Sequence, residues 1–216
     1  MPSTDVTLHD GSRAVVRPVR PGDKARVEAG FERLSPESRY RRFLAPMTRL
    51  SAETLRYLTE IDHHDHEALL ALDERDRAVG VARYVRSPAD PASAEAAVTV
   101  ADDWQGRGLG TTLTTLLADR ARTEGVERFT AVMLAENRDM LEVLEEVGPV
   151  RVIARDAGTL EVEAALPPEG MGEHAREMLR GAAGGRVEVR PPVGTRQGAS
   201  LRDEAPVYHQ GMPGHE

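Results

Sequence analysis

The 216-residue chain carries 28 Lys and Arg against 36 Asp and Glu, a net charge of -8, and contains no cysteine. This length allows one or two domains with a substantial core, and the acidic balance argues against a nucleic-acid partner, which requires a basic face. The lack of cysteine excludes disulfides, thiolate metal sites and a thiol-linked acyl-enzyme intermediate, and the lack of an apolar run of ~20 residues or an N-terminal hydrophobic segment indicates a cytoplasmic protein without a membrane partner.

The first third of the chain predicts one strand and then three short helices. Residues 12–19 alternate apolar and polar side chains, the pattern of a half-buried strand, and a Pro-Gly turn follows. Asp23 can cap the next helix, Ser35 precedes a proline at the start of a second, and Ser51 begins a third. These caps define the expected helix starts.

Two groups of polar residues in this region are candidate functional sites. Arg39, Arg41 and Arg42 could contact a substrate or a CoA phosphate, but we interpret them as a solvated helix face. Residues 62–67 contain three histidines and could bind zinc in principle. A short connector seldom gives convergent ligands, so we interpret this segment as a polar loop before a strand and expect no metal.

The rest of the chain alternates strands with two helices. The expected strands are 68–72 and 78–86, which form a hairpin around a turn at 73–77, then 96–100, 129–134, 150–154 and 160–166. One helix begins at the glycines after residue 105 and has its leucines on one face; a shorter one is capped by Asn137 and closed by Gly148 and Pro149. We therefore expect one domain over residues 1–166 and a disordered, Pro- and Gly-rich tail over residues 167–216.

The strand-loop-helix unit around the glycines is the strongest chemical signal. Gly106, Gly108 and Gly110 leave the backbone without Cβ atoms where it enters the helix, so an anion can approach the free N–H groups of the first turn. A phosphate or pyrophosphate is the expected ligand. A P-loop requires a lysine that is missing here, and a dinucleotide fingerprint requires a third glycine where Thr111 stands, so neither motif fits.

The remaining pattern is Q-x-x-G-x-G behind a V-T-V strand and ahead of a leucine-striped helix, and it resembles the acetyl-CoA-binding motif of the GNAT N-acetyltransferase superfamily. The phrases LHDGSRAVVRPVRPGD, FERLSPESRYRRF, LTEIDHHDHEALLAL, ADDWQGRGLG and LAENRDML are similar to bacterial protein lysine acetyltransferases of the actinobacterial kind. The resemblance covers roughly residues 8–166. It implies an α/β (α+β) GNAT fold with a mixed, mostly antiparallel central sheet and helices on both faces.

The resemblance also implies the positions of the cofactor contacts, with acetyl-CoA as co-substrate. Asn137 matches an asparagine that contacts the cofactor arm, although a helix-capping role is equally available. The helix after Asn137 lacks the tyrosine that many GNAT enzymes use to protonate the leaving thiolate, and Pro149 replaces a usual phenylalanine. The backbone groups expected to bond the pantetheine arm are those of Val98, Thr99 and Val100, and those expected to hold the pyrophosphate are the N–H groups of Gln105, Gly106, Arg107, Gly108, Leu109 and Gly110.

Glu95 is the candidate general base. A lysine amine has a pKa near ~10.4 and must lose a proton before it can attack a thioester. Glu95 stands where the resembling lysine acetyltransferases place their catalytic glutamate, and it shares strand parity with the small residues Ala97 and Thr99. Three functions stay open: a protein lysine acetyltransferase, an acetyltransferase for a small amine such as an antibiotic or polyamine, and a non-catalytic acyl-CoA-binding module. A homodimer is compatible with each.

Overall fold

The structure is a computed structural model that describes residues 3–167. The expected tail, residues 167–216, lies outside this part except for Pro167. The described elements are β1 (Thr4–Thr7), β2 (Arg13–Pro18), η1 (Pro21–Asp23), α1 (Lys24–Glu32), α2 (Pro36–Phe43), α3 (Ala52–Thr59), β3 (His66–Leu72), β4 (Ala78–Arg86), β5 (Ser93–Val100), η2 (Asp102–Trp104), α4 (Leu109–Thr123), β6 (Arg128–Leu134), α5 (Arg138–Glu145), β7 (Val150–Asp156) and β8 (Thr159–Ala165).

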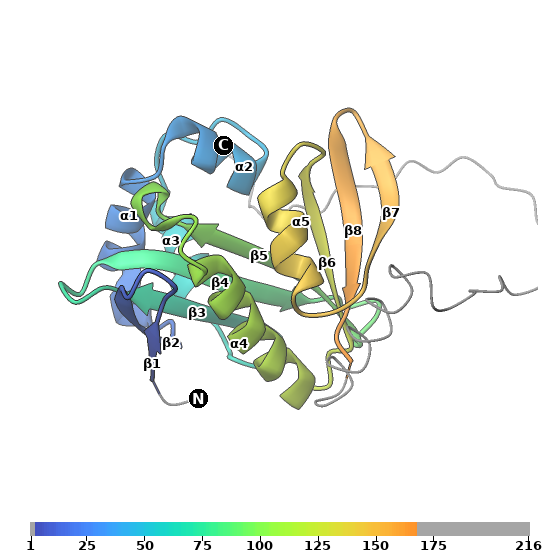
Figure 1. Cartoon of the computed structure of the whole chain (residues 1–216), viewed down its shortest axis with the longest axis horizontal. Helices are drawn as coiled ribbons and strands as arrows, with labels where there is room; N and C mark the ends of the chain where they lie inside the picture. Colours follow the sequence, from blue (N-terminus) through green and yellow to red (C-terminus); the bar gives the residue numbers. More distant parts are fainter. Residues whose placement is uncertain (1–2, 168–216) are drawn as a thin grey trace, which may run out of the picture. The chain divides into compact units, whose positions relative to one another are not determined.

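One eight-stranded sheet organises these elements, in the order β1-β2-β3-β4-β5-β6-β8-β7. Every neighbouring pair is antiparallel except β5 and β6, which run parallel. Figure 1 shows α4 and α5 lying across the sheet. Helices α1, α2 and α3 gather on the side of the sheet where β1 and β2 lie. The expectation of a mixed, mostly antiparallel sheet with helices is confirmed.

Successive side chains of the central strands point to opposite faces of the sheet, and an apolar cluster covers each face. Leu69 and Ala71 of β3 join the large core cluster under α4, whereas Leu70 belongs to a smaller cluster on the opposite face. Gly80 of β4 faces α4, because a Cβ built on it would lie 2.8 Å from a methyl group of Leu113. From Gly80 to Tyr84, even-numbered residues of β4 therefore face α4 and odd-numbered residues face the N-terminal helices; the order differs at Ala78 and Val79, where the β3–β4 register shifts.

Three of the expected helix caps form. The side chains of Ser35, Ser51 and Asn137 accept hydrogen bonds from backbone N–H groups in the first turns of α2, α3 and α5. The helical leucines are also inside: Leu113 and Leu117 of α4 are almost fully buried. Local hydrogen-bonding chemistry and apolar spacing were therefore sufficient to place these helices.

The expected cap at Asp23 is wrong. Asp23 stands before α1, but its side chain makes no cap hydrogen bond. Its buried carboxylate instead accepts two hydrogen bonds of 2.7 Å from Arg17 and one of 2.8 Å from the N–H of Arg20. A bidentate arginine contact is stronger than a neutral cap, so the carboxylate connects β2 to the turn before α1 rather than closing the helix end.

Strand β1 was not expected from the sequence. Its four residues contain one apolar side chain, Val6, which is too little for a periodic pattern. The strand forms because Thr4–Thr7 pairs antiparallel with β2 at the sheet edge. No helix among residues 3–167 has the length and apolar character needed to cross a membrane.

Candidate functional site

The parallel pair at the centre of the sheet opens into a fork. β5 runs to Val100, but its ladder with β6 contains only Ser93, Ala94 and Glu95. Beyond Glu95 the β6 edge of β5 has no strand partner among residues 3–167, while the other edge stays paired with β4. Figure 1 shows β5 and β6 diverging from this point. Apart from the carbonyl of Val100, which accepts from Gln105, the peptide groups of residues 96–100 that face this open edge can therefore bond an extended ligand as an added strand would.

A cradle of backbone donors lies at the start of α4. Gly106 and Gly108 have φ angles of +71° and +89°, the left-handed conformation that glycine adopts without strain. This turn leaves the N–H groups of residues 106–111 without a hydrogen-bond partner anywhere in the described chain. Six free donors at the positive end of a 15-residue helix form a site suited to a phosphate or pyrophosphate.

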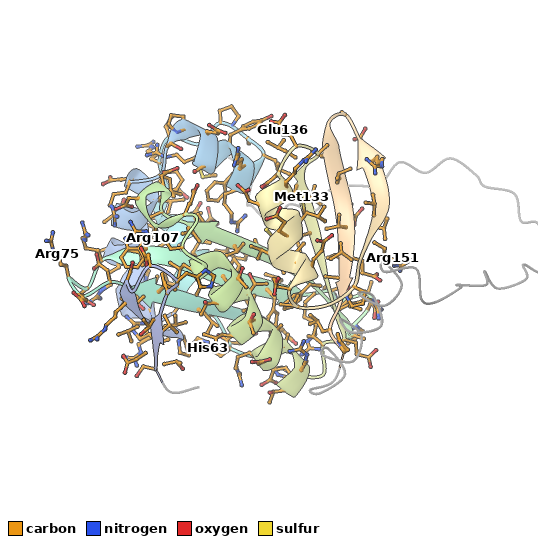
Figure 2. The ribbon with its side chains drawn as sticks, in the orientation of Figure 1. His63, Arg75, Arg107, Met133, Glu136 and Arg151 are labelled. Carbon is orange, nitrogen blue, oxygen red and sulfur yellow. The ribbon has the colours of Figure 1, made fainter. Side chains whose placement is uncertain are left out.

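The side chains of Gln105, Arg107 and Leu109 contact other parts of the protein and so anchor this loop. Gln105 donates from Nε2 to the carbonyl of Val100 at 3.1 Å, which ties the loop to the end of β5. Arg107, labelled in Figure 2, pairs with Asp10 at 3.0 Å and lies over the ring of Trp104, 5.2 Å from its centroid. Leu109 is buried. Contacts of this loop with a cofactor would therefore fall to its backbone. The expected donor at Gln105 is not free, because its N–H donates to the carbonyl of Asp102 at 3.4 Å.

Glu95 occupies the last position of the β5–β6 ladder, where the fork begins. Its side chain is exposed and makes no hydrogen bond or ion pair with the described residues. It points to the same face as Ala97 and Thr99, by strand parity. A carboxylate that is free, solvated and placed where two strands separate is available to take a proton from a substrate.

Asn137 lies after the end of β6 and is half-buried. Its Oδ1 accepts from the N–H of Met140 at 3.3 Å, so it caps α5. The side-chain NH₂ group remains without a partner in the described chain, and a cofactor contact is therefore compatible with the cap. Helix α5 itself contains no tyrosine.

The structure adds a feature that the sequence analysis missed, a cavity of about 80 Å³ between the sheet and helices α1 and α2. Its walls are mostly apolar, and Arg42 and Arg83 line it together with Thr99 and Ala97. The interpretation of Arg42 as part of a solvated helix face is therefore wrong: burial lowers its pKa, and the charge of Glu95 opposes that shift. The sequence does contain a signal for Arg83: it is the charged residue in the interior of the otherwise apolar strand AVGVARYVR, whose other charge, Arg86, is at the end. Its side chain points to the face of the sheet that the N-terminal helices cover.

The histidine-rich loop between α3 and β3 is held by hydrogen bonds rather than arranged around a metal. Asp62 accepts from the N–H groups of His64 and His66 at 2.9 Å each. The buried carboxylate of Glu67 contacts His63 at 2.7 Å and Arg120 at 3.1 Å; His63 is labelled in Figure 2. Within residues 3–167 no three His, Cys, Asp or Glu side chains converge as metal ligands.

Comparison with known proteins identifies the family of this chain. The family described as Acetyltransferase (GNAT) domain matches residues 13–150. Acetyltransferase Pat of Mycolicibacterium smegmatis is 35% identical over 164 residues, which cover 76% of this chain and 49% of that protein. Acetyltransferase PA5475 of Pseudomonas aeruginosa is 37% identical over 145 residues, 66% of this chain and 77% of that protein. The chain spans about half the length of the Pat relative.

Solved structures agree in fold. The GNAT domain of S. lividans PAT matches with a TM-score of 0.69 and 34% identity, covering 76% of this chain and 97% of that one. A cAMP-binding acyltransferase from Mycobacterium smegmatis matches with a TM-score of 0.56 and 27% identity, covering 87% of this chain and 56% of that one. With a matching family over most of the described residues and relatives above 30% identity, the chain belongs to the GNAT acetyltransferase family.

Proposed function

We propose that this chain is an N-acetyltransferase that moves an acetyl group from acetyl-CoA directly to a primary amine, with protein lysine side chains as acceptors. The observation that carries this proposal is the position of Glu95. A free carboxylate stands where β5 leaves β6, next to the peptide groups that would bond the pantetheine arm. No metal takes part in the proposed reaction.

The cofactor would bind along the fork and across the cradle. The N–H groups of residues 106–111 would hold the pyrophosphate, and the backbone of residues 98–100 would pair with the pantetheine arm. In this pose the thioester would lie at the base of the fork, near Glu95. Backbone N–H groups of β5 would polarise the thioester carbonyl as charge develops on its oxygen.

The reaction then requires one proton transfer and one acyl transfer. The ammonium of the acceptor gives a proton to Glu95, directly or through a water, and the neutral nitrogen attacks the carbonyl carbon. The carbon–sulfur bond breaks, and CoA leaves as a thiolate that water can protonate, since α5 offers no tyrosine for this step. The product is an acetylated amine and free CoA.

Lysine side chains are proposed as acceptors because the sequence resembles bacterial protein lysine acetyltransferases, and the relative named Acetyltransferase Pat, 35% identical over 164 residues, supports acetyl transfer. An exposed carboxylate at an open fork is also accessible to a side chain presented by a large partner. Acetylation of a small amine is the competing function. Incubation with labelled acetyl-CoA and cell lysate separates the two: label in macromolecules supports a protein acceptor, and label confined to small molecules contradicts it.

Replacement of Glu95 by Gln tests the catalytic role. The substitution keeps size and hydrogen bonding but removes the base, so kcat at pH 7 should fall by ~10² to 10⁴ while the Kd for acetyl-CoA changes less than about threefold. The loss should shrink as pH rises toward the pKa of the amine, near ~10.4, because solvent then supplies the neutral nucleophile.

Steady-state kinetics with a lysine peptide measure both effects. Glu74→Gln in the β3–β4 turn is the matched control, since it removes the same charge from an exposed position without a partner among the described residues. A Glu95→Gln variant with near-normal kcat at pH 7 would exclude Glu95 as the base.

A further inference from the structure

Arg83 is a buried guanidinium with unused hydrogen-bonding capacity. It is only 5% exposed, and its Nε and Nη1 atoms have no hydrogen-bond partner. Nη2 donates to the carbonyl of Leu58 at 3.2 Å and to Nε2 of His66 at 2.6 Å. A buried, incompletely paired charge costs several kcal/mol, so its presence in an apolar strand calls for a compensating partner.

The hydrogen bond between Arg83 and His66 orients the guanidinium and defines the protonation state of the imidazole. Because arginine can only donate, Nε2 of His66 must accept, which requires a neutral ring. Burial and the nearby charge of Arg83 lower the pKa of His66 to about 4, so the ring is neutral near pH 7. The ring of Tyr57 also lies against Arg83, 5.4 Å from the guanidinium carbon to the ring centroid.

Arg42 brings a second positive charge to the same cavity. Its guanidinium lies 5.0 Å from the ring centroid of Phe43 and forms no ion pair with any residue among 3–167. Neither arginine has a carboxylate in salt-bridge contact within the described chain. Two cations that share one small cavity repel each other, and burial together with Arg42 lowers the pKa of Arg83. An anion bound in the cavity would reduce both the repulsion between the two arginines and the free-energy cost of burying their charges.

The size and surroundings of the cavity define that anion. A volume of about 80 Å³ suits a small ligand. The rest of the wall is largely apolar and includes Val81, Leu58 and Phe43. A carboxylate attached to one or two methylene groups satisfies both features. The cavity also lies near Glu95, because Ala97 in its wall is two residues, ~7 Å, further along the same face of β5.

We propose that this cavity is a substrate subsite that holds a short carboxylate-terminated group between Arg83 and Arg42. The inference rests on the proposed acyl transfer and names the charge of one of its substrates. Two sources present the same chemistry beside Glu95. One is the acyl group of a dicarboxylic acyl-CoA such as succinyl-CoA; the other is an acidic side chain next to the acceptor amine.

Binding of a small probe tests the subsite without any turnover. Butanoate and butanamide have the same shape and differ in charge, so titration of the full chain, with CoA present and followed by NMR, should give saturable binding at least tenfold tighter for butanoate. Arg83→Met and, separately, Arg42→Met should each remove this preference by about tenfold or more, the loss expected for a charge-assisted hydrogen bond.

The matched control is Arg151→Met, which removes one positive charge from the exposed strand β7 (Figure 2) and should leave the preference intact. The Arg42 variant also guards against misfolding of the Arg83 variant, because Arg42 is only half-buried; circular dichroism and thermal melting are recorded for both. Equal affinity for the two probes, or a preference that survives both substitutions in folded protein, would overturn the proposal.

Kinetics then identify the source of the carboxylate. In the donor arm, a lysine peptide is paired with succinyl-CoA or butanoyl-CoA; in the acceptor arm, acetyl-CoA is paired with lysine peptides carrying a neighbouring Asp or Asn. One arm should show at least a tenfold preference in kcat/KM for the carboxylate, lost in both arginine variants. Turnover without charge preference in either arm would overturn the subsite but not the acyltransferase. Absence of all turnover would overturn the proposed function, and the butanoate titration would still decide the subsite.

Discussion

The position of α4 on the sheet depends on Gly80, and adding one methyl group there should move the helix that carries the phosphate cradle. A Cβ on Gly80 would lie 2.8 Å from Cδ1 of Leu113 and 3.3 Å from a methyl group of Leu109. Leu113 is fully buried and has nowhere to move without displacing its neighbours. Overpacking of this kind typically costs 1–3 kcal/mol, so we expect Gly80→Ala to lower the free energy of unfolding by about 2 kcal/mol.

A double-mutant cycle with Leu113→Ala isolates the steric cause. Leu113→Ala alone should cost about 2–5 kcal/mol, because it leaves a cavity under α4. In that background the methyl group of Gly80→Ala fills the cavity and stiffens the strand, so it should be neutral or stabilising. Urea unfolding followed by circular dichroism gives all four free energies. The cradle should respond as well: Gly80→Ala should weaken acetyl-CoA binding, measured by calorimetry.

Two results would refute this reasoning. Gly80→Ala could be as stable as the parent chain, which would mean that α4 is not tightly packed on β4. Alternatively, it could cost the same free energy with and without the Leu113 side chain. The cost would then come from the backbone of β4 and not from contact with α4.

Three further predictions follow from other contacts. Gly110→Glu should raise the Kd for acetyl-CoA at least tenfold, about 1.4 kcal/mol, because its carboxylate opposes a pyrophosphate in the cradle, while circular dichroism stays unchanged; calorimetry showing equal affinity would remove the loop from the site. Asp23→Asn should cost about 3 kcal/mol at pH 7, since it breaks a buried pair with Arg17 that lowers the pKa of Asp23 below 3.8, and in urea unfolding the difference should persist above that pH and shrink below it. The pKa of His66 is lowered from 6.5 to about 4, so the unfolded chain binds this proton more readily and stability falls as pH drops from 6.5 to 4; His66→Gln should reduce that loss, and unchanged urea midpoints across this range would contradict it.

Local patterns in the sequence were sufficient for most of the elements and for the backbone part of the site. Ser35, Ser51 and Asn137 cap their helices because a side-chain oxygen next to a free N–H group needs no tertiary partner. The turn at Gly106 and Gly108 follows equally from the residues themselves, since left-handed φ angles favour glycine. Strand alternation located most strands, and the family resemblance implied a mixed, mostly antiparallel sheet, but the order of the strands came from the structure.

Contacts between residues far apart in the chain were decided by the tertiary structure. The carboxylate of Asp23 could cap a helix or bind an arginine, and the energy of a bidentate buried pair selected Arg17. The sequence placed Glu95 on a strand, but the loss of the β5–β6 ladder after it depends on how two segments 35 residues apart diverge. The cavity likewise exists only where α1 and α2 cover β4 and β5. Helical periodicity reports which side of a helix is polar, but not what lies opposite a charged side chain, so the burial of Arg42 beside Arg83 could be recognised only from the packed fold.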